Sequence, residues 1–596
     1  MAVKLPKHLV GAMFAELFSI EMNNFDVEML LPALFWLVRS GGKDRAGTRT
    51  DAANITRYSA ALAGHEKLVG FLDEDGHRLL DKWVRSSLIQ TSAVGKRKSS
   101  EQIAYIRPLS FLCYKPSVPK QSSRLRQTHH FLYYLLNGYL RRDDHDRGAT
   151  ARYFDKLVQE TFANGVALNH GATKDGAYDG HTRLDLEVLL QLYYLDGFDA
   201  PNESNRGGKG VPPPACSLAA ENLAQDVAGF LTVYSRRVPT ATLSKYLMAL
   251  LNFELLIYTL RLMRATNELV IHDAAVPEFR PNSVSLSSLD LYVDLTQIRG
   301  SRSDQLAGAC VNRDFEEQEN FFRSKLMLRT LHNYVKDNDE IRPRLKQKTG
   351  GDYITALWSL RDHEDVRADA RRDLKEVRQI LRGEDEDDAN LPTDIRAVFE
   401  HGELNNLSRL VEILVLVQRK YGINNMAKWM ADVGGLRRED GLLRGNIRGR
   451  RIWRYVMSDT LLETLVQLAV ISPEAQKLSG EREPRPEPRS ITLSAFLIFL
   501  KNRFGLLIDT PPSFDSSSEA IAAAKDNFAA LKQRLRQMGL FMDLSDDFNA
   551  QRILTRFKKE MNDPTDQPPI PIRANLPPTA AARTEEHTRT EEHAPQ

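Results

Sequence analysis

Apolar residues recur at helical spacing along most of this chain, and that periodicity restricts its fold more than any other feature. Between Leu9 and Ile20 they fall three and four positions apart, the pattern of a helix that buries one face. Strand-like alternation is scarce, and Leu289–Leu295 (LDLYVDL) is its best internal example. The sequence therefore predicts a mainly α protein. Further helices are expected at Asn24–Val38, Phe131–Leu140, Tyr153–Phe162, Arg183–Leu195, Leu218–Val233, Leu243–Met263, Phe315–Val335, Leu407–Tyr421 and Thr460–Val470.

Segments rich in glycine, proline or charge divide the chain. Asn202–Pro214 (NESNRGGKGVPPP), Gly383–Asn390 (GEDEDDAN) and Ser479–Arg489 (SGEREPRPEPR) have compositions typical of loops or linkers. The final residues are too polar and too rich in proline to bury a core. We therefore predict a multi-domain helical protein with the following parts: an N-terminal helical domain (1–200), a linker (201–215), a middle helical domain (216–382), an acidic loop (383–390), a helical domain carrying an arginine-rich segment (391–478), a linker (479–489), a winged-helix-like module (490–560) and a disordered tail (561–596).

Charge and cysteine usage narrow the class of protein. The formal charge is 81 − 79 = +2, so nucleic acid can be recruited only by a local patch. Cys113, Cys216 and Cys310 form no CxxC pair, and three isolated cysteines fit a reducing compartment. The run Met29–Val38 is about half the ~20 residues that a membrane span needs. We expect a cytoplasmic protein without cofactor or metal.

Residues Ser490–Phe557 have the order helix, helix, hairpin, which is the plan of a winged helix. The helices are expected at Thr492–Phe504 and Ser517–Met538, and the hairpin strands at Leu540–Leu544 and Gln551–Phe557. In such a module the helix before the wing can enter a DNA major groove. The wing tip, however, is acidic and repels DNA, so docking onto a protein stays open. The candidate contact residues are Lys532, Arg534, Arg536, Arg552 and Arg556.

The segment Gly434–Arg454 (GGLRREDGLLRGNIRGRRIWR) is the most basic stretch of the chain. Its glycines disfavour a helix, so a loop is expected. Arginine interleaved with Trp453 and Tyr455 suits contacts with phosphates and bases. It also suits an acidic protein surface, so both partners remain possible. The candidate contact residues are Arg437, Arg438, Arg444, Arg448, Arg450, Arg451 and Arg454.

No sequence motif points to an enzyme. Walker, HExxH, GxSxG and kinase patterns are absent. The loop Asn169–Asp185 concentrates His and Asp, and the tail repeats RTEEH, but such composition is common in loops and no metal site is assigned. Arg124–His129 and Arg396–His401 match the spacing of helical higher-eukaryote-and-prokaryote nucleotide-binding (HEPN) ribonucleases. A chain with 14 His and 81 Lys or Arg yields at most about six such pairs by chance, so no catalytic residue is assigned.

Four segments near the C-terminus resemble a known group of proteins. They are Tyr421–Asn446 (YGINNMAKWMADVGGLRREDGLLRGN), Arg451–Val466 (RIWRYVMSDTLLETLV), Phe499–Asp509 (FLKNRFGLLID) and Asn527–Ile553 (NFAALKQRLRQMGLFMDLSDDFNAQRI). This roughly final quarter of the chain resembles large helical accessory proteins of bacterial phage-defence islands, most closely those of methylation-associated defence systems. The resemblance implies a cytoplasmic, non-catalytic component that works beside a methyltransferase, ATPases and a nuclease. It transfers no catalytic residue.

Three functional hypotheses follow. In the first, the chain is an accessory subunit of an antiviral defence complex that contacts DNA, partner subunits or both through the arginine-rich segment and the winged-helix-like module. In the second, it is a metal-independent ribonuclease that uses Arg124 and His129. In the third, it is a protein scaffold without nucleic-acid contact.

Overall fold

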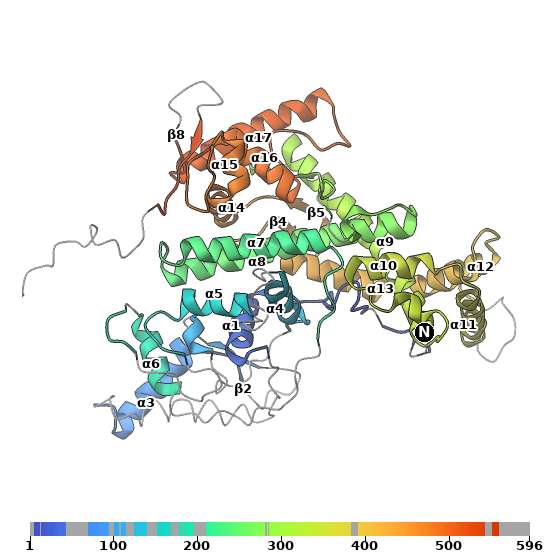
Figure 1. The fold of residues 1–596 in the computed structure, drawn as a ribbon, viewed down its shortest axis with the longest axis horizontal. Helices are drawn as coiled ribbons and strands as arrows, with labels where there is room; N and C mark the ends of the chain where they lie inside the picture. Colours follow the sequence, from blue (N-terminus) through green and yellow to red (C-terminus); the bar gives the residue numbers. More distant parts are fainter. Residues whose placement is uncertain are drawn as a thin grey trace, which may run out of the picture. The chain divides into compact units, whose positions relative to one another are not determined.

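Two long helices, α8 (Thr240–Ile271) and α9 (Arg302–Lys336), run through the centre of the fold (Figure 1). α8 is buried around most of its circumference, mainly through apolar side chains, as expected of a core helix. Among the described residues it is the one helix long and apolar enough to cross a membrane, and 94% of its most apolar window is buried inside the protein. It therefore acts as the core helix, against which α7, α9 and α14 pack.

The computed structural model describes residues 5–6, 8–11, 13–42, 70–93, 101–106, 109–114, 124–139, 152–168, 178–182, 184–195, 210–280, 283, 285–382, 391–542 and 551–558. All of them belong to one compact unit, Met1–Lys558, with a continuous hydrophobic core. The remaining helices are α1 (Leu30–Ser40), α3 (Glu74–Trp83), α4 (Thr128–Tyr139), α5 (Tyr153–Phe162), α6 (Leu186–Leu195), α7 (Ser217–Tyr234), α10 (Gly350–Ser359), α11 (Glu364–Arg382), α12 (Thr393–Glu400), α13 (Asn406–Val433), α14 (Asp459–Ile471), α15 (Pro473–Leu478), α16 (Leu493–Phe504) and α17 (Ser518–Gln537). The prediction of a mainly α protein is confirmed.

The strands are short and form small, separate sheets. β1 and β2 pair antiparallel, β3 pairs parallel with β7, and β4 pairs antiparallel with β5. Within the predicted strand Leu289–Leu295, only Leu291–Tyr292 is a strand, with a further bridge from Asp294 to Val456. The bounds are β1 (Ile89–Ala93), β2 (Glu101–Ile106), β3 (Leu291–Tyr292), β4 (Leu443–Asn446), β5 (Gly449–Tyr455), β6 (Ile491–Thr492), β7 (Leu506–Leu507), β8 (Phe541–Met542) and β9 (Arg552–Ile553).

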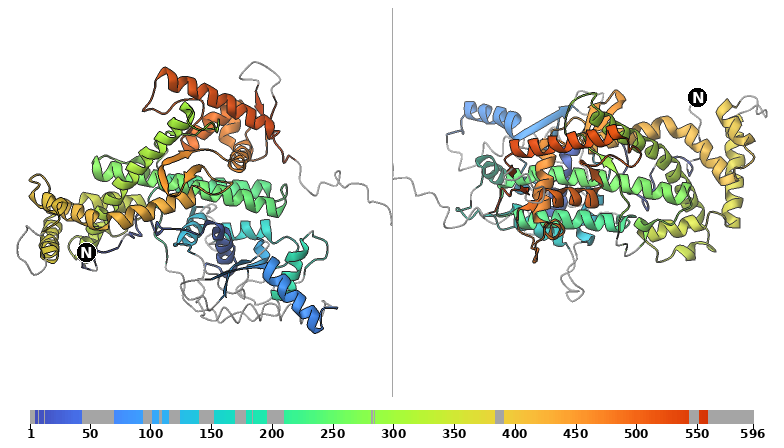
Figure 2. Two further views of the ribbon diagram at one scale, coloured as in Figure 1. Left: turned by 180° about the vertical axis from the view of Figure 1, so that it is seen from behind. Right: turned by 90° about the horizontal axis from the view of Figure 1, so that it is seen from above.

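Helices α9 and α13 pack closely along each other, and α11 lies against both (Figure 2). Gly422 permits this approach, because a Cβ at that position would lie 2.3 Å from the ring of Phe322 on α9. The side-chain amide of Gln318 on α9 also donates to the carbonyl of Ile423 at 3.2 Å. The middle of α13 is thereby fixed against the core helices.

The segment Leu9–Ile20 is not the helix that its periodicity predicts. Its backbone is irregular, and side chains of other elements bond its carbonyl groups. Arg329 of α9 donates to Val10 at 2.8 Å, and Gln418 of α13 donates to Leu9 at 3.3 Å. Most of the apolar side chains are buried nonetheless. The prediction was wrong because tertiary partners satisfy the backbone groups that a helix would pair internally.

The C-terminal part contains a three-stranded antiparallel sheet in the order β6–β9–β8. α16 follows β6, and α17 precedes β8, in the positions expected from the sequence. The predicted hairpin is present but its described strands are only two residues long, with Phe541 paired to Ile553. Its turn, residues 543–550, lies outside the described residues. The winged-helix assignment stays a prediction.

The predicted domain boundaries also stay predictions. Residues 201–209, the acidic loop 383–390 and the tail 561–596 lie outside the described residues. The second predicted linker, 479–489, forms several hydrogen bonds with the residues before it. The backbone amide of Arg489 donates to the carbonyl of Val470 at 3.0 Å. The side chain of Gln476 donates to the carbonyl of Glu487 at 2.9 Å and accepts from the amide of Arg485 at 2.9 Å.

Helix α17 is anchored by a fully buried amide side chain. Asn527 accepts from the amide of Leu295 at 2.6 Å. It donates to the carbonyls of Val293 at 2.8 Å and Ile508 at 3.0 Å. One side chain thus satisfies backbone groups from two other segments, which places α17 against β3 and the residues after β7.

We predict that Asn527→Ala lowers the free energy of unfolding by about 3 kcal/mol, because it leaves buried backbone groups without partners. The measurement is urea denaturation of the full chain, followed by tryptophan fluorescence. Gln533→Ala, at an exposed position of the same helix, serves as the control and should change stability by less than about 0.5 kcal/mol. Equal stability of the two variants would contradict this anchoring role.

Candidate functional site

The arginine-rich segment is a β-hairpin and not the predicted loop. β4 and β5 pair from Leu443 opposite Tyr455 to Asn446 opposite Gly449, with an irregularity between Arg444 and Asn446. Gly445 lies there with a φ of +153°, and a Cβ on it would come within 2.6 Å of the Trp453 ring. Glycine is therefore required at that position. The glycines that disfavour a helix here shape a tight hairpin.

The two aromatic residues of the hairpin are buried. Trp453 packs its ring 5.2 Å from that of Phe315 on α9 and donates its indole N–H to Asn446 at 2.7 Å. The Tyr455 hydroxyl donates to Oδ2 of Asp314 on α9 at 2.7 Å. The expectation that these aromatics contact bases is therefore wrong, since both rings are used to hold the hairpin on α9. Alternation along Arg451–Tyr455 was the sequence signal for this arrangement.

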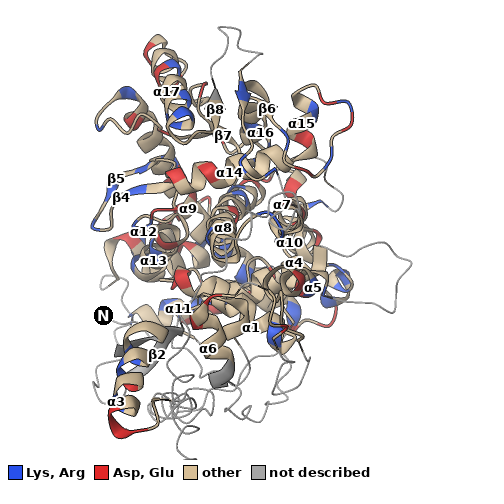
Figure 3. Cartoon of the chain, turned by 90° about the vertical axis from the view of Figure 1, so that its left-hand side faces the viewer, with Lys and Arg blue, Asp and Glu red and all other residues tan. Residues whose placement is uncertain are grey.

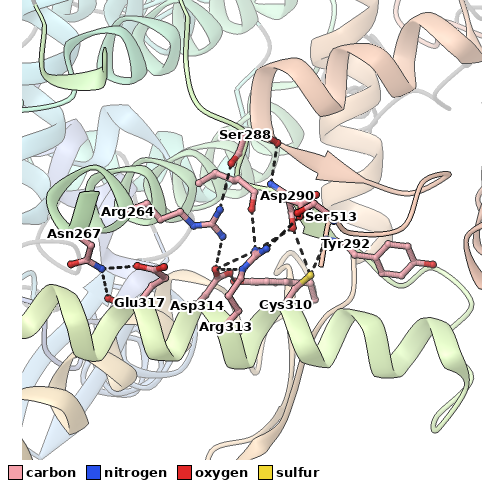
Figure 4. Close-up of polar contacts among 12 residues, drawn as sticks. Arg264, Asn267, Ser288, Asp290, Tyr292, Cys310, Arg313, Asp314, Glu317 and Ser513 are labelled. Carbon is pink, nitrogen blue, oxygen red and sulfur yellow. Dashed lines mark hydrogen bonds and ion pairs between the residues drawn. The ribbon is translucent and has the colours of Figure 1, made fainter. Parts of the chain in front are cut away.

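Asp314 is the centre of a polar network between α8, α9 and β5. Figure 4 shows its contacts with Arg264 and Arg313. Arg264 of α8 donates to its Oδ1 at 2.6 Å, and Arg313 lies 3.4 Å from the same oxygen. Arg313 also lies 3.6 Å from Asp290, which in turn accepts from the Ser513 hydroxyl at 2.6 Å. Burial and the Asp314 carboxylate raise the pKa of Tyr455 well above its ordinary value. Tyr455 therefore remains a hydrogen-bond donor.

Three of the seven arginines predicted to contact a partner form ion pairs or hydrogen bonds within the protein itself. Arg454 forms an ion pair with Asp304 at the start of α9. Arg438 pairs with Asp440, and Arg444 donates to the backbone carbonyl of Arg438 at 2.5 Å. These side chains are half-buried, and their charges are largely used to position the segment.

The side chains of the other four candidate arginines are directed more toward solvent. Arg437 is exposed near Asp432, and Arg448 and Arg451 are exposed on the hairpin. Arg450 is half-exposed and donates to Oδ1 of Asn424 on α13 at 2.5 Å. Among the described residues, Arg448, Arg450 and Arg451 form no ion pair, and Leu443–Tyr455 contains no Asp or Glu.

The hairpin therefore continues into one face of α13. Tyr421, Asn424 and Lys428 are spaced three and four residues apart, so they share a face of the helix. The bond from Arg450 to Asn424 connects that face to the hairpin. Figure 3 shows Lys and Arg on the β4–β5 hairpin. We call this set the hairpin surface: Arg448, Arg450, Arg451, Tyr421, Asn424 and Lys428.

The basic residues of the C-terminal part are less available than the sequence predicts. Arg534 is only 8% exposed; its guanidinium donates to Asp459 at 3.0 Å and to the carbonyl of Met457 at 2.9 Å. It cannot make the predicted phosphate contact without leaving these partners. Arg556 is exposed, but its guanidinium forms an ion pair with Glu463.

The three remaining candidates of this part are wholly or partly exposed. Arg552 lies on β9 and reaches the carbonyl of Ser490 at 3.4 Å. Lys532 and Arg536 lie over the rings of Phe528 and Phe541 respectively, at 5.0 and 5.7 Å. The exposed face of α17 also carries Glu519 and Asp526, so its charge is mixed.

The residues considered for catalysis have structural partners. Arg124 precedes α4 and pairs with Asp26 at 2.8 Å, while the His129 ring lies 4.1 Å from that of His130. Arg396 is on α12, and His401 caps the C-terminus of that helix. No group of three or more His, Cys, Asp and Glu in the described part of the chain could hold a metal ion. Much of Asn169–Asp185 and the whole RTEEH repeat lie outside that part.

We predict that Tyr455→Phe lowers the free energy of unfolding by about 2 kcal/mol, because a buried carboxylate loses a hydrogen-bond donor. The measurement is the urea midpoint of the full chain. Tyr421→Phe is the matched control, since it removes the hydroxyl of an exposed tyrosine and should leave the midpoint unchanged. If the two variants are equally stable, the Asp314 network does not hold the hairpin.

A match to one known protein family spans nearly all of the described residues. A family model described as methylation-associated defense system protein MAD7 matches residues 10–557. The match extends far beyond the final quarter on which the sequence resemblance rests, and it includes α8, α9 and the hairpin surface. A comparison with curated proteins finds no match. The chain belongs to the family of the methylation-associated defense system protein MAD7.

Proposed function

We propose that the chain is a non-catalytic accessory subunit of a cytoplasmic anti-phage defence complex, and that its hairpin surface binds nucleic acid. Membership of a defence-system family implies other defence proteins as partners. The single observation that carries the nucleic-acid part is the hairpin itself, which presents Arg448, Arg450 and Arg451 without an acidic partner among the described residues.

The chemistry of these side chains matches a phosphate backbone. Guanidinium groups bind phosphate oxygens through paired N–H donors, and each phosphate contact releases counterions. The hairpin is held on α9 by Trp453, Tyr455 and Arg454. A surface that is already ordered loses less conformational entropy on binding, which favours affinity. The overall charge of +2 supplies no comparable attraction, so the interaction should be local.

A protein scaffold is the second candidate function. Ile447 and Ile452 are exposed on the hairpin beside the arginines, a combination that also fits a protein interface. The internal pairing of Arg534 and Arg556 likewise favours protein docking by the C-terminal part. The ribonuclease hypothesis is the weakest, since Arg124 is held by Asp26.

We predict that the triple substitution Arg448→Ala, Arg450→Ala, Arg451→Ala weakens duplex DNA binding and flattens its salt dependence. Losing about three phosphate contacts should reduce the slope of log K against log salt by about 2.7. The measurement is fluorescence anisotropy of the full chain with a labelled duplex between 50 and 200 mM salt. Matched methylated and unmethylated duplexes show whether the protein senses methylation.

The control removes the same charge elsewhere. Arg344, Arg371 and Arg482 are exposed and lie outside the hairpin surface. Their triple alanine variant should keep most of the affinity and slope of the wild type. Equal losses in both variants would show that only net charge matters and would remove the hairpin from the proposal.

The scaffold function makes a different prediction. If the hairpin surface docks a partner protein, the defence proteins of the same system should co-purify with the tagged chain after nuclease treatment, and the hairpin variant should lose them. If nucleic acid mediates the association, nuclease treatment should release the partners from the wild type as well.

A further inference from the structure

Tyr421 is the most exposed large apolar side chain in the described part of the protein, with 75% of its surface accessible. A tyrosine ring on a solvated helix face gains nothing from burial, and Asn424 and Lys428 further along that face are polar and exposed. Folding of the chain therefore does not require an aromatic residue at this position.

The backbone beneath the ring is fixed on both sides. Gly422 packs against the Phe322 ring, and the Ile423 carbonyl accepts from Gln318 of α9. Arg419, two positions earlier, pairs with Glu319 of α9 at 2.8 Å. Because these contacts hold α13 on α9, the base of the Tyr421 side chain has a defined position while its ring stays in solvent.

The ring lies on the same helix face as the groups that meet the hairpin. Asn424 is one helical turn further along and accepts from Arg450. Lys428 follows at the next turn and is exposed. The exposed aromatic ring therefore shares its helix face with the groups beside the hairpin arginines. Tyr421–Trp429 contains no Asp or Glu, and Glu319 of the neighbouring α9 is paired with Arg419.

We propose that the hairpin surface takes a single-stranded segment of nucleic acid, with one base stacked on Tyr421 and the adjoining phosphates on Arg448, Arg450 and Arg451. This inference rests on the proposed nucleic-acid function. Arginine binds duplex and single strands alike, but an exposed aromatic ring adds affinity only where a base has a free face. In a duplex both faces of an internal base are covered by its stacked neighbours.

The test compares two probes and three variants of the full chain. The probes are a fluorescein-labelled 20-nucleotide oligo(dT) and a labelled 20-base-pair duplex, measured by anisotropy at one low salt concentration. Tyr421→Ala should weaken oligo(dT) binding about tenfold and change duplex binding by less than twofold. Tyr421→Phe keeps the ring and should bind as the wild type does. Ile498→Ala, an exposed apolar position on α16, is the control.

A second readout depends on contact and not on stability. Oligo(dT) that carries 5-iodouracil should crosslink on irradiation to the peptide containing Tyr421, and the hairpin triple variant should reduce the yield. Crosslinks confined to other peptides would overturn the proposed stacking.

The outcomes separate this inference from the function on which it rests. If the wild type binds duplex but not oligo(dT), or if Tyr421→Ala affects both probes equally, the single-strand inference is overturned while nucleic-acid binding stands. If the wild type binds neither probe at low salt, the proposed nucleic-acid function itself is overturned, and with it the single-strand inference.

Discussion

The buried carboxylate of Asp314 joins the parts of the protein that matter for the proposed site. It accepts from Arg264 on α8 and from Tyr455 on β5, while Asp314 itself belongs to α9. A carboxylate removed from water is stable only when donors surround it, and each lost donor costs more than an exposed bond would. Satisfying this charge therefore helps to orient the hairpin relative to the two core helices, together with the packing of Trp453 and the ion pair of Arg454.

The same need to provide carboxylates with donors explains the positions of many arginines. Arg503 on α16 binds Asp226 and Asn222 on α7, and Arg534 on α17 binds Asp459 at the start of α14. These pairs join the C-terminal helices to the rest of the fold. A guanidinium offers several donors in a fixed plane, so it can bridge a carboxylate and backbone carbonyls at once. Charge counted along the sequence consequently overstates the charge that a partner can reach.

Sequence periodicity predicted much of α8, α9 and α13, because an apolar stripe at helical spacing must be buried somewhere. It predicted α9 and α13 too short and did not predict the mainly polar α11. Tyr153–Phe162 was predicted with the bounds that α5 has. The same periodicity gave a wrong prediction at Leu9–Ile20. There, Arg329 and Gln418 donate hydrogen bonds to the backbone from other helices. No local pattern reveals such partners, which lie more than 300 residues away in the chain.

The candidate site was predictable in composition but not in geometry. Its arginines were identified from the sequence, whereas the inward direction of Trp453 and Tyr455 depends on Phe315 and Asp314. In the sequence, Tyr421 marks only the end of the predicted helix Leu407–Tyr421 and the start of a segment that carries the family resemblance. Its role emerges from α13, whose packing at Gly422 brings that helix face beside the hairpin. Adjacency of this kind arises from tertiary contacts and has no signature within either segment.

The central claim is that the hairpin is a preformed surface for nucleic acid. Hydrogen–deuterium exchange of the full chain, with and without oligonucleotide, tests both halves of it at once. The account predicts slow exchange of the hydrogen-bonded amides of Leu443–Tyr455 in the free protein, because the two strands are paired and β5 packs on α9. It predicts further protection there and in the middle of α13 when oligonucleotide is added. Rapid exchange of the hairpin in the free protein, or protection that arises only in other segments on binding, would contradict the account.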